Sequence, residues 1–328
     1  MKAAILKELH GYPEIESCPV LEPKAGQSLI RVEATALNRR DEWIRIGAYP
    51  HIRLPAVLGS DVCGLVESSP STPNLIGERV LLCPSLNWGE NEAHQSPKFH
   101  ILGMPSSGGL AEFMCIDNDL IFKAPKHLSA SQAASFPLAG LTAWRAVVTK
   151  GQLKSGHRCL VTGAGGGVSS FAIRFALALG AEVWVTSGSD DVIASVKRLG
   201  VHDGVNYRDP EWSKKIKTGF DLVVDGAGGE GFGALVRCLG VSGKIVFYGG
   251  TCGKWPKISP QHLFFRQASI IGTTMGSPKE FEEMLAFIEQ HQLTPRIDSE
   301  WCLEDIEAAF CRLVSPERDG KVVIRMND

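Results

Sequence analysis

A strand, a glycine turn and a helix follow one another directly between residues 159 and 179. The apolar run Cys159–Val161 leads into glycines at 163 and 165–167, and a helix is predicted from Ser169 to Leu179. Glycine permits positive φ in a tight turn and lets the main chain approach a ligand closely. The N–H groups and dipole at a helix start attract an anion. The unit therefore predicts a turn that holds a dinucleotide pyrophosphate, against the alternative of a glycine turn without a ligand.

Four further apolar runs follow this turn, and at least one predicted helix, 190–199, lies between them. The runs predicted as strands are residues 181–186, 201–207, 220–225 and 243–248. Short apolar strands that alternate with helices are typical of an α/β fold with a doubly wound parallel sheet. The last of these strands, 243–248, is predicted to form an edge of the sheet.

Composition excludes several classes of partner. A chain of 328 residues is too long for one typical core and predicts two domains. Its net charge of −2 gives no reason to expect a nucleic-acid partner. No stretch approaches the roughly 20 apolar residues of a membrane span. The early charges at Lys2 and Lys7 predict no signal peptide. We expect a small-molecule substrate, no nucleic acid and no membrane.

Nine cysteines are present, and none lies in a C-x-x-C pair. This pattern predicts neither a zinc ribbon nor a disulfide framework. Several of the cysteines lie inside apolar strands, so we expect buried free thiols and a cytoplasmic location.

The residues on either side of the glycine-turn region have a different sequence pattern from it. Short β runs with Pro and Gly between them occur along residues 1–125, among them 2–6, 29–36, 57–66 and 79–83. A polar stretch at 84–105 predicts a surface lobe, and Lys321–Arg325 predicts a last strand. We therefore predict one β-rich domain from residues 1–126 and 266–328. A nucleotide-binding domain, residues 127–265, is inserted between its two parts.

Short motifs that match one protein family occur in order along nearly the whole chain. They are ATALNRRD (34–41), LGSDVCG (58–64), GERV (77–80), GGLAEF (108–113), LAGLTAW (138–144), the glycine turn (161–169), NY (206–207), FFRQ (264–267), GTTMG (272–276) and GKVV (320–323). Together they resemble the medium-chain dehydrogenase/reductase superfamily, and within it the zinc-less branch related to quinone oxidoreductases. The resemblance implies a GroES-like β domain, a Rossmann domain, an active site in the cleft between them, and a homodimer.

The resemblance also bears on metal binding. Zinc-using relatives carry a Cys where this chain has Asn38, and a His–Glu pair where it has Ser60–Asp61. Zinc prefers thiolate and imidazole ligands, so no catalytic zinc is expected. The lobe 84–105 lacks the four cysteines of the family's structural zinc site. Without a Lewis acid, the expected acceptors are quinones and conjugated enals or enones, which spread negative charge over their own π systems.

Five residues are candidates for the catalytic site: Asn38, Asp41, Tyr49, Asp61 and Thr142. Asn38 and Thr142 match positions that line the nicotinamide pocket in the family, and Tyr49 is a candidate hydrogen-bond donor. The two aspartates are expected to orient neighbours or to pair with Arg39 and Arg40. Because relatives share no universal catalytic acid, we expect the protein to act mainly by positioning.

The coenzyme is predicted to be NADP(H) rather than NAD(H). The second strand ends at Ser187 and Ser189, where an NAD-binding unit usually carries an acidic residue that would repel a 2′-phosphate. Tyr207 matches the region near that phosphate in NADP-using relatives. Against this, Val192 replaces a lysine that such relatives often carry. The other predicted coenzyme contacts are Gly163, Ala164, Gly165, Gly166, Gly167, Val168, Gly226, Gly249, Gly250 and Thr251.

These observations predict a zinc-independent NAD(P)H-dependent oxidoreductase that reduces quinones or activated carbonyls and alkenes by direct hydride transfer. Two alternatives stay open. One is an alcohol dehydrogenase-like enzyme, and the other is a non-catalytic NADPH-binding structural or sensor protein.

Overall fold

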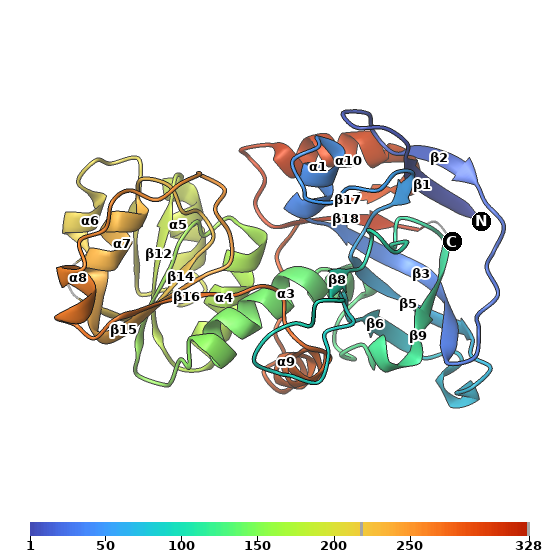
Figure 1. Ribbon diagram of the computed structural model, residues 1–328, viewed down its shortest axis with the longest axis horizontal. Coiled ribbons are helices and arrows are strands. Elements are labelled where there is room, and N and C mark those ends of the chain that lie inside the picture. Colours follow the sequence, from blue (N-terminus) through green and yellow to red (C-terminus); the bar gives the residue numbers. More distant parts are fainter. Residues whose placement is uncertain (217–218, 327–328) are drawn as a thin grey trace. The chain divides into compact units, whose positions relative to one another are not determined.

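The computed structural model describes residues 1–216 and 219–326, which divide into two compact units (Figure 1). The first contains residues 1–141 and 276–328, and the second contains 142–275. The sequence placed these boundaries at 126/127 and 265/266. Each unit is described by itself below.

The second unit is built on a six-stranded sheet in the order β13-β12-β11-β14-β15-β16, and every neighbouring pair is parallel. The strands are β11 (Arg158–Val161), β12 (Glu182–Ser187), β13 (Asp203–Asn206), β14 (Phe220–Asp225), β15 (Leu239–Phe247) and β16 (Ser269–Gly272). The predicted doubly wound parallel sheet is confirmed. The predicted edge is wrong, because β16 pairs along β15 and leaves β13 and β16 as the edges.

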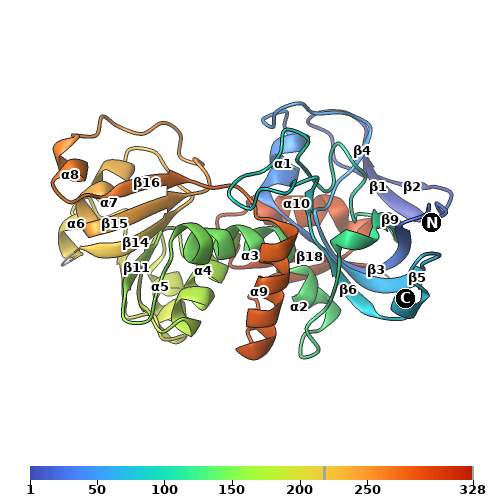
Figure 2. The same cartoon turned by 60° about the horizontal axis from the view of Figure 1, so that its bottom comes forward.

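Helices cover both faces of this sheet (Figure 2). The helices α4 (Gly167–Ala178) and α5 (Asp190–Lys197) lie on one face, and α7 (Phe232–Cys238) and α8 (Gln261–Phe264) lie on the other. The short α6 (Trp212–Lys215) and the π-helix Arg145–Lys150 complete the unit. Fully buried side chains of the strands and of α7 form its core, among them Leu160, Phe220, Val223, Phe232 and Ile245.

The first unit is mostly β-sheet. Its main sheet runs β10-β6-β5-β3-β18-β17, and β9 also pairs with β3. These strands are β3 (Gln27–Leu37), β5 (Asp61–Ser68), β6 (Arg79–Leu82), β9 (Phe113–Asp117), β10 (Ile121–Lys123), β17 (Ile297–Cys302) and β18 (Lys321–Arg325). Two small sheets join β1 (Lys2–Leu6) to β2 (Glu14–Ser17) and β4 (Ala56–Val57), and β7 (Ser85–Leu86) to β8 (His100–Ile101).

Its helices are α1 (Arg39–Arg45), α2 (Ala130–Ala134), α9 (Pro278–Gln290) and α10 (Ile306–Val314), with 3₁₀ turns at Pro73–Leu75, Asn118–Leu120 and Leu303–Asp305. The helix α3 (Pro137–Trp144) crosses the boundary into the second unit.

Strand register brings three chain segments to one edge of the main sheet. The strand β3 is antiparallel to β5 on one side and to β18 on the other. Ala36 pairs with Asp61, and Leu37 pairs with Val322. The end of β3 therefore lies beside the beginnings of β5 and β18, although residues 38, 61 and 321 are far apart in sequence.

The start of β5 is fixed by a close crossing of glycine-rich segments. Gly59 has φ +92°, a value that favours glycine, and its neighbour Ser60 is fully buried. A Cβ atom on Gly108 would lie 2.3 Å from the Gly59 carbonyl oxygen. This turn separates β4 from β5, where the sequence predicted one continuous strand from 57 to 66.

All nine cysteines are free thiols, and Cys63, Cys83, Cys159 and Cys238 are buried. Burial raises the pKa of Cys63 and of Cys83 to about 12, so both are neutral thiols at physiological pH. No helix in the described ranges is long and apolar enough to cross a membrane.

Candidate active site

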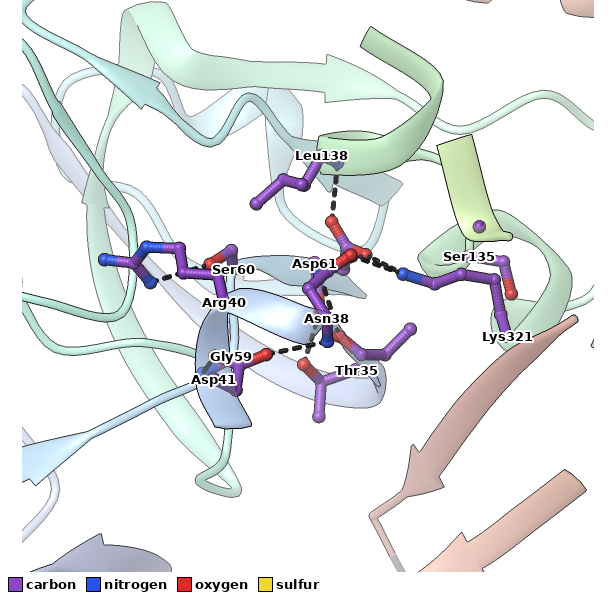
Figure 3. A network of polar contacts seen from close by, with 12 residues as sticks. Thr35, Asn38, Arg40, Asp41, Gly59, Ser60, Asp61, Ser135, Leu138 and Lys321 are labelled. Carbon is purple, nitrogen blue, oxygen red and sulfur yellow. Dashed lines mark hydrogen bonds and ion pairs between the residues drawn. The ribbon is translucent and has the colours of Figure 1, made fainter. Parts of the chain in front are cut away.

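A buried polar network joins the ends of β3, β5 and β18 (Figure 3). The Lys321 ammonium donates to Asn38 Oδ1 at 2.7 Å and to Asp61 Oδ2 at 2.8 Å. Asn38 Nδ2 donates to the same Asp61 oxygen at 2.9 Å, and the Leu138 N–H donates to Asp61 Oδ1 at 2.6 Å. Lys321 is 3% exposed, Asp61 0% and Asn38 7%. The network is therefore an internal ion pair bridged by an amide.

Asp41 fixes the turn that carries Asn38. Asn38 is the N-cap of α1, and its N–H donates to Asp41 Oδ2 at 2.8 Å, which forms a capping box. The other Asp41 oxygen accepts from the Gly59 N–H at 3.4 Å. Burial raises the pKa of Asp41, and the cation of Arg40 together with these N–H groups opposes the shift. Asp41 thus links the start of α1 to the turn before β5.

Arg40 attaches the lobe 84–105 to this turn. Its guanidinium donates to the carbonyls of Leu102 (3.2 Å) and Met104 (2.7 Å) and to Ser60 Oγ (3.2 Å). The half-buried ring of Tyr49 lies 5.0 Å from the guanidinium carbon, within range of a cation–π contact. Tyr49 therefore contacts Arg40 rather than the aspartates. Thr142 lies in the second unit, buried, with its hydroxyl 3.8 Å from Met275 Sδ.

The predicted coenzyme turn lies between β11 and α4. Gly163 has φ +63°, and Gly166 is the N-cap of α4. The Ala164 N–H donates to the Thr186 carbonyl at 2.9 Å, which ties the turn to the end of β12. A Cβ atom on Gly163 would have no described atom within 4 Å, so the main chain there is open to a ligand. The local structure has the form that the glycine cluster predicted.

A tyrosine connects this turn to the ends of β14 and β15. The Ser169 hydroxyl donates to the Thr162 carbonyl at 2.7 Å, so the Tyr248 hydroxyl at 3.1 Å must donate to Ser169. Burial raises the pKa of Tyr248 to about 12. A Cβ atom on Gly226 would lie 2.4 Å from the Tyr248 ring, so this position requires glycine. The Gly226 carbonyl also accepts from the Thr251 hydroxyl at 2.8 Å.

Hydroxyls and a cation gather at the end of β12. The Ser189 N–H donates to Ser187 Oγ at 3.2 Å, and Ser189 caps α5. A Cβ atom on Gly188 would lie 2.6 Å from the Tyr207 hydroxyl and 3.2 Å from Arg208 Nε. Ser187, Ser189 and Tyr207 are therefore neighbours, and Arg208 adds a positive charge beside them.

A pocket of about 390 Å³ opens at the carboxyl ends of β15 and β16, where ligands of doubly wound sheets bind. Its lining consists of Phe247, Tyr248, Gly249, Gly250, Trp255, Gly272 and Thr273. The Trp255 ring is stacked on Phe232 at 3.8 Å between ring centroids. The Thr273 hydroxyl is buried and has no hydrogen-bond partner among the described residues. Gly249 and Gly250 were among the predicted coenzyme contacts, whereas Trp255 and Thr273 were not.

Comparison with known proteins identifies the family. Residues 24–126 match the family of the alcohol dehydrogenase GroES-like domain, and residues 167–290 match that of zinc-binding dehydrogenases. A zinc-type alcohol dehydrogenase-like protein, YogA, of Leptosphaeria maculans is 32% identical, over 93% of this chain and 92% of its own length. The chain belongs to the medium-chain dehydrogenase/reductase superfamily. It is an oxidoreductase with a GroES-like domain and a Rossmann-like parallel sheet, as the motifs predicted.

Two further relatives of this superfamily bear on specificity. The quinone oxidoreductase of Mus musculus is 29% identical, over 92% of this chain and 90% of its own length. A solved structure of an NAD-dependent alcohol dehydrogenase superposes with a TM-score of 0.92 and 33% identity over the full length of both chains. The superfamily implies a nicotinamide coenzyme, and these relatives leave the choice between NAD and NADP open.

The zinc implied by the matched family does not fit the residues present. Zinc sites of enzymes use three protein ligands, usually thiolates, imidazoles or carboxylates. The matching positions hold an amide (Asn38), a hydroxyl (Ser60) and one carboxylate (Asp61). The carboxylate and the amide already bind the Lys321 ammonium, and the Ser60 hydroxyl donates to the Leu102 carbonyl at 2.7 Å. No cluster of three or more His, Cys, Asp or Glu side chains suited to a metal ion occurs in the described ranges.

The buried network around Asp61 contains one residue, Lys321, that was not among the predicted catalytic residues. Asn38, Asp41 and Asp61 lie together, but Asp61 pairs with Lys321 rather than with Arg39 or Arg40. The motif at 320–323 was among those that match the family, but no role was predicted for Lys321. The sequence signal for Lys321 is only a charge directly before three apolar residues, 322–324, of the strand Lys321–Arg325.

Proposed function

We propose that this protein is a zinc-independent, NADP(H)-dependent oxidoreductase that reduces quinones or conjugated carbonyl compounds. The observation that carries the proposal is the donor set at the family's metal positions, where an amide and a carboxylate hold an ammonium. An acceptor that delocalises negative charge needs hydrogen-bond donors rather than a Lewis acid. The similarity to quinone oxidoreductases supports this substrate class.

The preference for NADP(H) rests on the end of β12. Ser187 and Ser189 offer hydroxyls where an acidic residue would repel a 2′-phosphate, and Arg208 lies beside them with a positive charge. Opposing charges lie nearby at Asp190 and Asp191. The Asp190 carboxylate is hydrogen-bonded to Asn206 at 3.1 Å, which partly satisfies it.

The residues of this chain act by binding and orientation. The bound nicotinamide coenzyme supplies a hydride. The turn 163–168 and the N-terminus of α4 would hold its diphosphate, and the glycines that follow β15 would allow close approach of a ring. Thr142 and Tyr49 are proposed as further contacts of the reacting molecules. The final proton comes from solvent or from a hydroxyl.

Steady-state kinetics test the proposal. Purified protein is assayed with NADPH and with NADH against a panel of quinones, enones and simple ketones, and its zinc content is measured by elemental analysis. We expect NADPH oxidation with quinones or enones, weaker use of NADH, and no stoichiometric zinc. Reduction of simple ketones by protein with one zinc per chain would instead establish an alcohol dehydrogenase. Tight NADPH binding without turnover of any acceptor would establish a non-catalytic role.

We also propose a homodimer and a cytoplasmic location. The second rests on nine free thiols, which suit a reducing compartment.

A further inference from the structure

Lys321 is a buried cation at the first residue of β18. Lysine is seldom buried unless it is paired, and this side chain is 3% exposed. Its partners come from the ends of two other strands, Asn38 after β3 and Asp61 at the start of β5. The strand register holds these three positions together, so the ammonium is fixed from both sides.

The hydrogen bonds of the ammonium are incomplete. An ammonium has three N–H donors, and Lys321 uses one on Asn38 Oδ1 and one on Asp61 Oδ2. No third acceptor for it occurs among residues 1–216 and 219–326. An unmet N–H on a buried cation is costly, which favours an acceptor that arrives with a ligand.

Neither Asp61 nor Asn38 has a free N–H group to donate to a ligand. Asp61 is an acceptor, and its second oxygen already accepts from the Leu138 N–H. The Asn38 amide donates to Asp61 at 2.9 Å and, more weakly, to the Ala36 carbonyl at 3.4 Å. Among the side chains of Lys321, Asn38 and Asp61, Lys321 is therefore the donor that retains a hydrogen for a ligand.

We propose that Lys321 is a catalytic residue, whose third N–H binds the carbonyl oxygen of the hydride acceptor. This inference rests on the proposed function. The ammonium is bonded to the residues at two of the family's metal positions, and it supplies a positive charge there without a metal ion. Asn38 and Asp61 hold the ammonium in place, so both are positioning residues.

In the proposed step, the reduced nicotinamide is the hydride donor and the carbonyl compound is the acceptor. The carbonyl compound accepts a hydride with its electron pair, its π electrons move to oxygen, and the nicotinamide is left oxidised. The resulting anionic oxygen is bound by the Lys321 N–H, which keeps its proton, and a solvent proton completes the reduced product. A preorganised donor of this kind contributes about 10²–10³ in kcat.

The test compares Lys321→Met and Lys321→Arg with the wild type in two measurements. One is the rate of quinone reduction. The other is NADPH binding in the absence of acceptor, monitored by protein fluorescence. We expect Lys321→Met to lower kcat about 100-fold while the Kd of NADPH stays unchanged. Lys321→Arg keeps the charge and should recover part of the loss. With Lys321→Ala, ethylammonium should restore activity in a concentration-dependent way.

Because Lys321→Met leaves Asp61 as an unpaired buried charge, it lowers stability. The double variant Lys321→Met/Asp61→Asn removes that charge, and we expect it to fold and still show a low kcat. Lys123→Met, which changes an exposed lysine on β10, is the matched control and should behave as wild type.

A wild-type kcat in Lys321→Met, or recovery of kcat in the double variant, would overturn the inference. So would a raised NADPH Kd with unchanged kcat, since the ammonium would then face the coenzyme. Absence of turnover in the wild type would overturn the proposed function itself, and this inference with it.

Discussion

Ser169 joins the predicted coenzyme turn to two other segments of the second unit. The hydroxyl is accommodated because it donates to the Thr162 carbonyl and accepts from Tyr248, whose ring covers Gly226. Three segments of the nucleotide-binding unit thus meet at one side chain.

We predict that Ser169→Ala and Tyr248→Phe each lower the free energy of unfolding by about 1 kcal/mol, the net value of a typical hydrogen bond. Because they remove the same bond, the double variant should lose less than the sum. Urea unfolding of the four proteins measures this coupling. Strict additivity would mean that the Ser169–Tyr248 bond contributes nothing to stability.

Arg208 is the residue whose charge most directly tests the proposed preference for NADP(H). We expect Arg208→Gln to raise the KM for NADPH about tenfold, equivalent to about 1.4 kcal/mol, and to leave the KM for NADH unchanged, because only NADPH carries the 2′-phosphate. Initial rates with each coenzyme at saturating acceptor measure both values. Arg198→Gln, at the exposed C-cap of α5, is the control. Equal effects on both coenzymes would contradict a specific contact.

Whether a helix or strand could be predicted depended on its length and on how clear its pattern of apolar residues is. The strand–turn–helix segment from β11 to α4 was predictable because its apolar strand, glycines and helix lie next to each other in sequence. The strand β16 was missed because four residues between a helix and a glycine turn carry little pattern. The helix α1 was missed because its signal is a capping box, Asn38 with Asp41, rather than an apolar period.

The site was predictable only in part for a related reason. Asn38 and Asp61 stood in family motifs, whereas the role of Lys321 depends on how β18 pairs with β3, which no local pattern encodes. The Arg40 contacts with the carbonyls of Leu102 and Met104 likewise join segments about 60 residues apart. Main-chain carbonyls have no sequence signal as acceptors.

The attachment of the lobe 84–105 gives a prediction for an element. Arg40→Met removes the donors to two buried carbonyls and to Ser60, and should lower the free energy of unfolding by about 2–4 kcal/mol. It should also speed proteolytic cleavage within 84–105, because the lobe loses its attachment to α1. Thermal unfolding and limited proteolysis measure both effects. Arg39→Met, at an exposed neighbour, is the matched control, and equal sensitivity of the two variants would contradict this role for Arg40.

For the whole molecule, the sheet of the second unit leaves β16 as an edge strand whose outer side has no partner in the described residues. Large apolar side chains are exposed close to it, Phe264 at 57% and Phe265 at 77%. Exposed strand edges and apolar patches favour pairing with another chain. A second copy of this chain offers the same edge, which suits an interface with two-fold symmetry.

We therefore predict that the wild type elutes as a dimer of the 35.5 kDa chain, and that Phe264→Glu/Phe265→Glu shifts it toward monomer. Two charges on each copy would meet across the two-fold axis and repel one another while losing apolar contact. Light scattering after size-exclusion chromatography measures the mass over a range of protein concentrations. Leu199→Glu, at an exposed apolar residue that follows α5, should stay dimeric. A monomeric wild type, or equal dissociation of both variants, would place the interface elsewhere or remove it.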